Sequence, residues 1–140
     1  MRRHVLLDTG PLVASLDARD RYHEWTRAEL MEIEPPLLTC EAVLTEACFL
    51  LRNRFPGPAA VLESVQREAI ALPFVLADHL DPVRRLLRKY ADTGISLAEA
   101  CLVRMSECYA DAAVLTFDSD FRLYRRFGRQ TIPVIMPPSR

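Results

Sequence analysis

The chain lacks the features that mark membrane, zinc-binding and repeat proteins. Its four cysteines show no C-x-x-C spacing, and each lies in an apolar segment. We therefore interpret them as small core residues in a reducing compartment, not as zinc ligands or disulfide partners. Every uncharged run is far shorter than the ~20 residues that a transmembrane helix needs, and we find no internal repeat, linker or low-complexity segment. These absences predict a soluble protein, which we expect in the cytoplasm.

Lysine is almost absent, and positive charge comes from arginine. Lys89 is the single lysine among eighteen basic residues, and the formal net charge is −1. A charge this close to zero creates no global field that would draw the protein to nucleic acid or to a membrane. Arginine suits bidentate phosphate contacts, and for the local runs both a phosphate-binding role and a solvated helical face stay open. These runs are Arg84, Arg85, Arg88 and Lys89, and then Arg122, Arg125 and Arg126.

Short β-rich runs alternate with longer helical patterns along the 140 residues, which are enough for one domain. This alternation predicts an α/β fold in which helices cover both faces of a parallel sheet. The expected strands are 4–8, 37–39, 73–76, 112–117 and 131–135, and the expected helices are 9–17, 23–33, 41–52, 58–71, 82–90, 96–109 and 119–127.

Four acids stand in apolar surroundings, where carboxylates are rare. Asp8 closes HVLLD and Asp118 closes AAVLTFD, so each follows a predicted strand. Ligands of parallel sheets bind beyond the carboxyl ends of the strands, which places these two acids at one edge. Glu46 in AVLTEACFLL and Glu99 in ISLAEACLV have apolar neighbours three and four residues away. We therefore expect both helical acids to point inward.

The four acids would repel one another if the fold brings them together. Two carboxylates about 4 Å apart repel by about 4 kcal/mol at an effective dielectric near 20, so such a cluster takes up protons or a cation. Mg²⁺ and Mn²⁺ prefer oxygen ligands. Helix capping is the alternative for Asp8 and Asp118, and a capping box with Ser96 is the alternative for Glu99. His4, His23 and His79 show no acid–base partner in the sequence, and we expect no catalytic role for them.

Two unrelated folds share part of this pattern. D-T-G at 8–10 also occurs in retroviral-type aspartic proteases, but a helical pattern follows directly here, whereas that fold is almost entirely β. A receiver domain of a signalling relay places acids at strand ends as well. It requires a lysine after the last strand pair, and Lys89 does not stand there.

Motifs along nearly the whole chain resemble those of the PIN-domain ribonucleases, including the VapC-type toxins. They are DTGPLVASLDARDRYHEW, VLTEACFLL, YADTGISLAEACLV and VLTFDSDFRLYR, in this order. The resemblance implies a three-layer α/β/α sandwich with a central parallel sheet, as a single PIN-like domain over 1–140. It also implies an endoribonuclease that cleaves RNA through a metal-activated water, with Mg²⁺ or Mn²⁺ as cofactor. The implied metal-binding acids are Asp8, Glu46, Glu99 and Asp118, supported by Thr9, Thr116 and the secondary acid Asp120, while Arg122, Arg125 and Arg126 would contact RNA.

One position departs from the family pattern. The third acid is most often Asp in this family, whereas this chain has Glu99, which is longer by one methylene. Asp92 in YADTG is a fallback acid, but its loop context favours a turn or capping role.

The resemblance also implies partners. We expect an RNA substrate, a cognate antitoxin protein and a homodimer, with the apolar helices predicted at 23–33 and 41–71 as contact surfaces. The alternative is a degenerate PIN scaffold that binds RNA or protein without cleaving.

Overall fold

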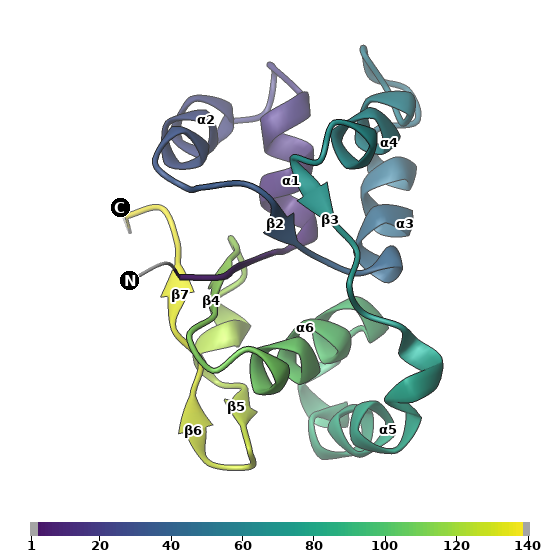
Figure 1. Cartoon of the computed structure of the whole chain (residues 1–140), viewed down its shortest axis with the longest axis vertical. Coiled ribbons are helices and arrows are strands. Elements are labelled where there is room, and N and C mark those ends of the chain that lie inside the picture. Colours follow the sequence, from purple (N-terminus) through teal and green to yellow (C-terminus); the bar gives the residue numbers. More distant parts are fainter. Residues whose placement is uncertain (1–2, 139–140) are drawn as a thin grey trace.

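A parallel sheet forms the centre of the computed structural model, which describes residues 3–138 (Figure 1). The strand order is β3-β2-β1-β4-β7, and every neighbouring pair is parallel. Strands β1 and β4 are wholly buried, as expected where helices cover both faces of a sheet. The predicted α/β fold is confirmed. The strands are β1 (Val5–Leu7), β2 (Leu37–Leu38), β3 (Ile70–Ala71), β4 (Ala113–Leu115) and β7 (Val134–Ile135).

Helices lie on both sides of this sheet, with α1 and α2 above it and α5 and α6 below it in Figure 1. Helix α6 packs against β1, β4 and α5, while α1 packs against α2 and α3. Within residues 3–138, no helix has the length and apolar composition that crossing a bilayer requires. The α-helices are α1 (Thr9–Leu16), α2 (His23–Met31), α3 (Glu41–Leu50), α4 (Ala59–Gln66), α5 (Leu80–Lys89) and α6 (Leu97–Cys108). Short 3₁₀ helices are η1 (Leu76–Asp78), η2 (Ala91–Thr93) and η3 (Ser119–Arg122).

Four predicted elements are wrong or displaced. The helix predicted at 58–71 ends at Gln66, and its last two residues instead form β3. The strand predicted at 73–76 is irregular, because the strand precedes Pro73, which has no amide hydrogen for the ladder. The helix predicted at 119–127 is limited to η3. It is followed by a hairpin of β5 (Arg125–Arg126) and β6 (Gln130–Thr131), so the strand predicted at 131–135 is split between β6 and β7.

The cysteines are free thiols, as predicted. Cys40 and Cys101 are buried in the core. Cys108 is exposed at the end of α6, so the prediction of a core role is wrong for this residue.

The end of β1 is held from both sides. The Asp8 amide donates to the Leu115 carbonyl of β4 at 3.0 Å, and the buried Thr39 hydroxyl donates to the Leu7 carbonyl at 2.6 Å. Directly afterwards α1 begins, and an added Cβ at its second residue, Gly10, would lie 2.9 Å from the Phe117 ring. These contacts bring the start of α1 against the loop after β4 and fix the backbone direction at Asp8.

The Thr39 contact yields a stability prediction. Thr39→Val keeps the side-chain shape but removes the hydroxyl, so a buried carbonyl loses a partner. We expect the free energy of unfolding to fall by about 1–3 kcal/mol in urea titrations. As the matched control, Thr45→Val removes a hydroxyl bond to the Glu41 carbonyl on the exposed face of α3 and should change stability by less than about 0.5 kcal/mol. Equal effects of the two substitutions would contradict the role given to Thr39.

Candidate active site

An open cleft of about 440 Å³ lies at the carboxyl ends of β1 and β4. All four predicted acids line it, although they come from four separate segments of the chain. Among the described residues that line the cleft, none is Lys, Arg or His. The lining consists of Asp8, Thr9, Gly10, Glu46, Leu50, Ser96, Glu99, Phe117 and Asp118.

Asp8 is the buried acid of the cleft. Its Oδ1 accepts the Thr9 amide at 2.8 Å, and its Oδ2 accepts the Thr116 hydroxyl at 2.7 Å. Burial raises the pKa of Asp8, and the charges of Asp118 and Glu46 raise it further, while the two hydrogen bonds act in the opposite direction. Asp8 is also the N-cap of α1. Capping and a position in the cleft are therefore properties of the same carboxylate.

Thr116 joins the two acids that follow strands. Its hydroxyl donates to Asp8 and accepts the Asp118 amide at 2.9 Å. Asp118 Oδ1 in turn accepts the Asp120 amide at 2.8 Å. Thr116 is fully buried, so this polar bridge is shielded from water. Asp120 supports Asp118 through its backbone, and its carboxylate is not part of the cleft lining.

Glu46 is exposed, which contradicts the prediction that it points inward. Its carboxylate nevertheless reaches the cleft, where Oε2 accepts the Thr9 hydroxyl at 3.0 Å. The buried face of α3 is instead formed by Val43, Leu44 and Ala47. Helix α3 is apolar on nearly every face, so periodicity alone did not identify the face that packs against the core.

Glu99 forms the capping box that the sequence offered as one alternative, and it also lines the cleft. Its Oε1 accepts the Ser96 amide at 2.8 Å, and its own amide donates to the Ser96 hydroxyl at 3.0 Å, which completes a capping box at the start of α6. Partial burial raises the pKa of Glu99 to about 7, and the adjacent Asp118, with which it shares a hydrogen bond, adds to this shift. Glu99 therefore retains a proton at pH values where an ordinary glutamate has lost it.

The donor set of the cleft consists of oxygen atoms, which suits a hard divalent cation. No three His, Cys, Asp or Glu side chains within residues 3–138 form a group that could hold a metal ion by themselves. Mg²⁺ keeps several of its waters and is held by one or two carboxylates together with substrate phosphates. The residues present fit that mode of binding and do not fit a closed cage of protein ligands.

Several residues considered from the sequence lie outside the cleft. Asp92 is exposed in η2. His23 bonds the Ala14 carbonyl through Nδ1 at 2.6 Å, and His79 accepts a hydrogen bond from Arg104. His4 has an acidic partner that the sequence did not reveal, because its Nδ1 lies 2.7 Å from Asp111 Oδ1. This pair stands where β1 and β4 begin, at the opposite ends of these strands from the cleft.

The three arginines expected to contact RNA have different surroundings. Arg122 is exposed, whereas Arg126 is half-buried and bonds the Ser106 carbonyl at 3.3 Å. Arg125 donates to the Arg122 and Tyr124 carbonyls at 2.7 and 3.1 Å. None of the three lines the acidic cleft.

Sequence reasoning missed Gly10, Leu50, Ser96 and Phe117 as cleft residues. Gly10 and Phe117 lie within two residues of a predicted acid, so proximity along the chain was the available signal.

The Tyr124 phenol is buried without a hydrogen-bond partner in the described part of the chain. Burial raises the pKa of Tyr124, and the nearby Glu99 carboxylate adds to this effect. No sequence pattern indicated its position.

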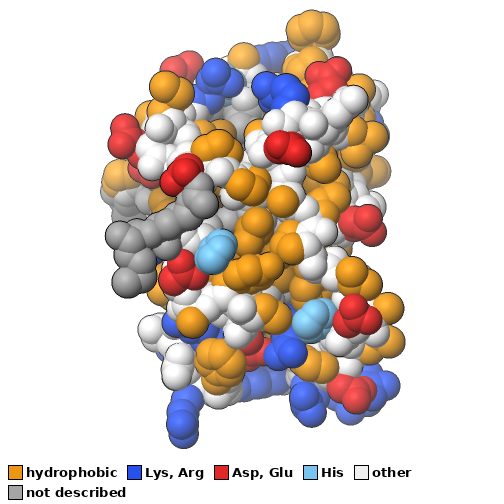
Figure 2. All heavy atoms as spheres, in the orientation of Figure 1, with side chains coloured by type: hydrophobic (Ala, Val, Ile, Leu, Met, Phe, Trp, Pro, Cys, Tyr) orange, Lys and Arg blue, Asp and Glu red, His pale blue; other side chains and the backbone are white. Residues whose placement is uncertain are grey.

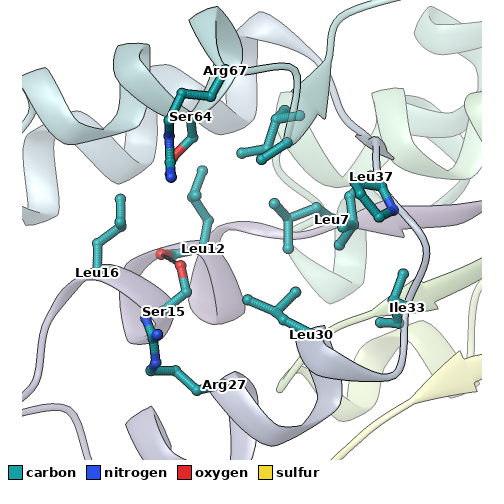
Figure 3. A pocket seen from close by; sticks show the side chains of 13 residues that line it. Leu7, Leu12, Ser15, Leu16, Arg27, Leu30, Ile33, Leu37, Ser64 and Arg67 are labelled. Carbon is teal, nitrogen blue, oxygen red and sulfur yellow. Dashed lines mark hydrogen bonds between the residues drawn. The ribbon is translucent and has the colours of Figure 1, made fainter.

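A second cavity, of about 260 Å³, is mainly apolar and has no acid in its lining. Figure 3 shows Leu12 and Leu16 of α1 with Leu30 of α2, and the Arg27 and Arg67 side chains on opposite sides of the cavity. Its chemistry differs from that of the cleft and suits an apolar occupant.

The sequence model of the PIN-domain family matches residues 5–126 of this chain. The chain belongs to the PIN-domain family. This PIN domain is 27% identical over 134 residues to the ribonuclease VapC26 of Mycobacterium tuberculosis, covering 94% of this chain and 99% of that protein. In fold it is similar to the crystal structure of M. tuberculosis VapC20, a toxin that cleaves the sarcin–ricin loop. The TM-score is 0.73 at 19% identity, and the match covers 83% of this chain and 91% of the other. The resemblance seen in the sequence motifs is confirmed.

The raised pKa of Glu99 predicts how the stability of the metal-free PIN domain depends on pH. An unfolded glutamate ionises near 4.5, whereas Glu99 in the folded chain ionises at about 7. Between these values the folded chain keeps a proton that the unfolded chain has lost. The contribution of Glu99 to the free energy of unfolding is thus complete below pH 4.5 and is lost as the pH rises through 7.

Glu99→Gln should therefore flatten this decline and raise stability above pH 7, measured by urea denaturation in EDTA across the pH range. Asp8 retains a shift of the same sign, so some slope will remain. The matched control is Glu63→Gln at an exposed position of α4, which should keep the wild-type profile. Identical profiles for the two variants would show that Glu99 titrates normally.

Proposed function

We propose that this PIN domain is a Mg²⁺- or Mn²⁺-dependent endoribonuclease and the toxin of a toxin–antitoxin pair. The observation that carries the proposal is the meeting of Asp8, Glu46, Glu99 and Asp118 in one cleft without a basic residue in its lining. Uncompensated carboxylates at the carboxyl edge of a parallel sheet are suited to bind a cation. Similarity to the ribonuclease VapC26 along nearly the whole chain supports RNA as the substrate.

Asp8 and Asp118 would hold the cation, since Thr116 fixes both of them. When bound, the ion supplies positive charge at the scissile phosphate and lowers the pKa of a water. Thr9 keeps the Glu46 carboxylate at the mouth of the cleft. Glu99 lies beside Asp118 in the same cleft, and its carboxylate would orient a water of the bound ion.

An antitoxin peptide is the partner that suits the apolar cavity in Figure 3. Such a peptide would place apolar side chains between α1, α2 and α4 and present a basic side chain to the acidic cleft. Self-association as a homodimer is supported by exposed apolar side chains on α3 and α4, where Phe49, Leu50 and Leu62 are 61%, 53% and 61% exposed. An apolar patch of this kind favours a protein interface.

A degenerate scaffold that binds RNA without cleaving is the second candidate. The observation in its favour is that no group of three His, Cys, Asp or Glu side chains among the described residues could hold a metal by itself. Cleavage of an RNA panel with and without divalent metal separates the two candidates. Cleavage that EDTA abolishes and Mg²⁺ restores is the result expected of the nuclease.

Asp8→Asn tests the metal site. Asn retains helix capping but removes the buried charge, so the fold should persist. Mn²⁺ binding by isothermal titration should be lost, and cleavage should fall by about 100-fold or more. Asp81→Asn at an exposed position of α5 is the matched control and should behave as wild type. Unchanged Mn²⁺ binding by the Asp8 variant would place the metal elsewhere.

The toxin role predicts arrest of growth when the chain is expressed alone. Co-expression of the adjacent small gene should relieve the arrest, since its product would cover the cleft. The Asp8→Asn variant should not arrest growth, although it is produced at the same level. Normal growth with abundant folded wild-type protein would contradict the toxin role and leave nuclease activity open.

A further inference from the structure

The acidic cleft does not supply the positive charge that binding a polyanion requires. Its lining contains four carboxylates and no basic residue, so RNA phosphates near it are repelled. Affinity for nucleic acid comes largely from Lys and Arg contacts to phosphates. A substrate that reaches this cleft must therefore be held by cations elsewhere on the surface.

Such cations surround a pocket between α5, α6 and the β5–β6 hairpin. The pocket has a volume of about 270 Å³. Figure 2 shows blue basic side chains gathered at the lower end of the molecule, where Figure 1 places α5 and the hairpin. Arg85 and Lys89 lie four residues apart on α5 and thus share one face. The charged residues that line the pocket are Arg85, Lys89, Arg104, Glu107 and Arg125.

Most of this positive charge has no acidic partner. Glu107 pairs with Arg104 at 3.1 Å. Lys89 donates to the Gly128 carbonyl at 3.2 Å and lies 5.4 Å from the centre of the Tyr90 ring. The Arg125 guanidinium donates to backbone carbonyls. Within residues 3–138, no carboxylate lies within ion-pair distance of Arg85, Lys89 or Arg125. Three cations therefore face one pocket without compensation, which favours an anionic occupant.

An aromatic ring stands at the edge of the same pocket. Phe127 lines it and is 52% exposed. Its φ is +53°, a backbone conformation that bulky residues rarely adopt. The Phe127 amide donates to Glu107 Oε2 at 2.6 Å, which helps to hold the backbone in this conformation. An exposed ring beside cations can stack on a base that is not paired.

Two chain segments lead directly from the cleft to this pocket. Helix α6 lines the cleft with Glu99 and the pocket with Arg104, about 8 Å farther along its axis at 1.5 Å per residue. The second segment runs from Asp118, in the cleft, through η3 to Arg125. An RNA strand that reaches both sites would follow the surface beside these segments.

We propose that this pocket is a subsite for single-stranded RNA. Arg85, Lys89 and Arg125 bind backbone phosphates away from the cleaved bond, and Phe127 stacks on a base. The proposal rests on the proposed ribonuclease function and adds how the substrate is held. Of the three arginines expected from the sequence to contact RNA, it includes Arg125 alone.

Binding of a short fluorescein-labelled single-stranded RNA, measured in EDTA over a series of NaCl concentrations, tests the subsite without cleavage. Arg85→Gln should weaken binding and reduce the slope of log K against log[salt] by about 0.7, the value for one lost phosphate contact on a single strand. Arg85→Lys should restore the slope. Phe127→Asn, which tolerates this backbone conformation, should weaken binding about tenfold with the slope unchanged.

The controls are Arg19→Gln and Phe55→Ala, which alter an exposed arginine and an exposed phenylalanine away from the pocket. Both should bind as wild type, and melting temperatures should confirm that every variant folds. An unchanged slope for Arg85→Gln in folded protein would overturn the subsite. So would a poly-glutamate peptide that binds as tightly as the RNA and shows the same loss, since the pocket would then dock protein. Equal affinity for duplex RNA would overturn the stacking role of Phe127.

Cleavage by the wild type, measured separately with Mg²⁺, distinguishes this proposal from the proposed function. Metal-dependent cleavage combined with unchanged slopes would refute the subsite and support the nuclease. Absence of cleavage combined with the expected slopes would refute the nuclease and support the pocket as a site for single-stranded RNA.

Discussion

The parallel pairing of β1 with β4 determines where the acids of the cleft lie. Leu7 stands opposite Leu115 in this register, so the next residues, Asp8 and Thr116, meet just beyond the ends of both strands. Their hydrogen bond forms only in this alignment. A slip of one residue would turn the buried apolar side chains of β1 to the opposite face. Burial of the strands thus maintains the register, and the register places the carboxylates.

Opposite charges are separated along α6. Its first turn contributes Glu99 to a cleft without basic residues, and its later turns contribute Arg104 to a pocket where cations predominate. An arginine inside the cleft would neutralise the carboxylates and compete with a metal ion for them. Placing the cations at a distance leaves the acids available. A net charge of −1 therefore conceals two strongly charged sites.

The sequence predicted the acids whose location follows directly from the strand that precedes them. Asp8 and Asp118 follow short apolar strands, and parallel strands bring such residues to one edge. Glu46 was placed on the wrong face, because α3 is apolar on nearly all sides and its exposed face carries Phe49 and Leu50.

The segment 119–127 has a helical pattern of residues but forms 3₁₀ helix and hairpin. Phe121 and Tyr124 are fully buried and their rings pack together, and the Tyr124 ring also packs against Tyr90. That tertiary packing outweighs local helix preference, and the basic pocket, which depends on this hairpin, was therefore not visible in the sequence.

The length of the Glu99 side chain lets its carboxylate contact both Ser96, in the capping box, and Asp118. One carboxylate oxygen bonds the amide that begins α6, while the same carboxylate faces Asp118 across the cleft. An aspartate, shorter by one methylene, would reach less far toward both. Any event in the cleft that draws this carboxylate away from Ser96 leaves a backbone amide without its partner. Loss of that hydrogen bond would weaken the first turn of α6, the helix that also contributes Arg104 to the basic pocket.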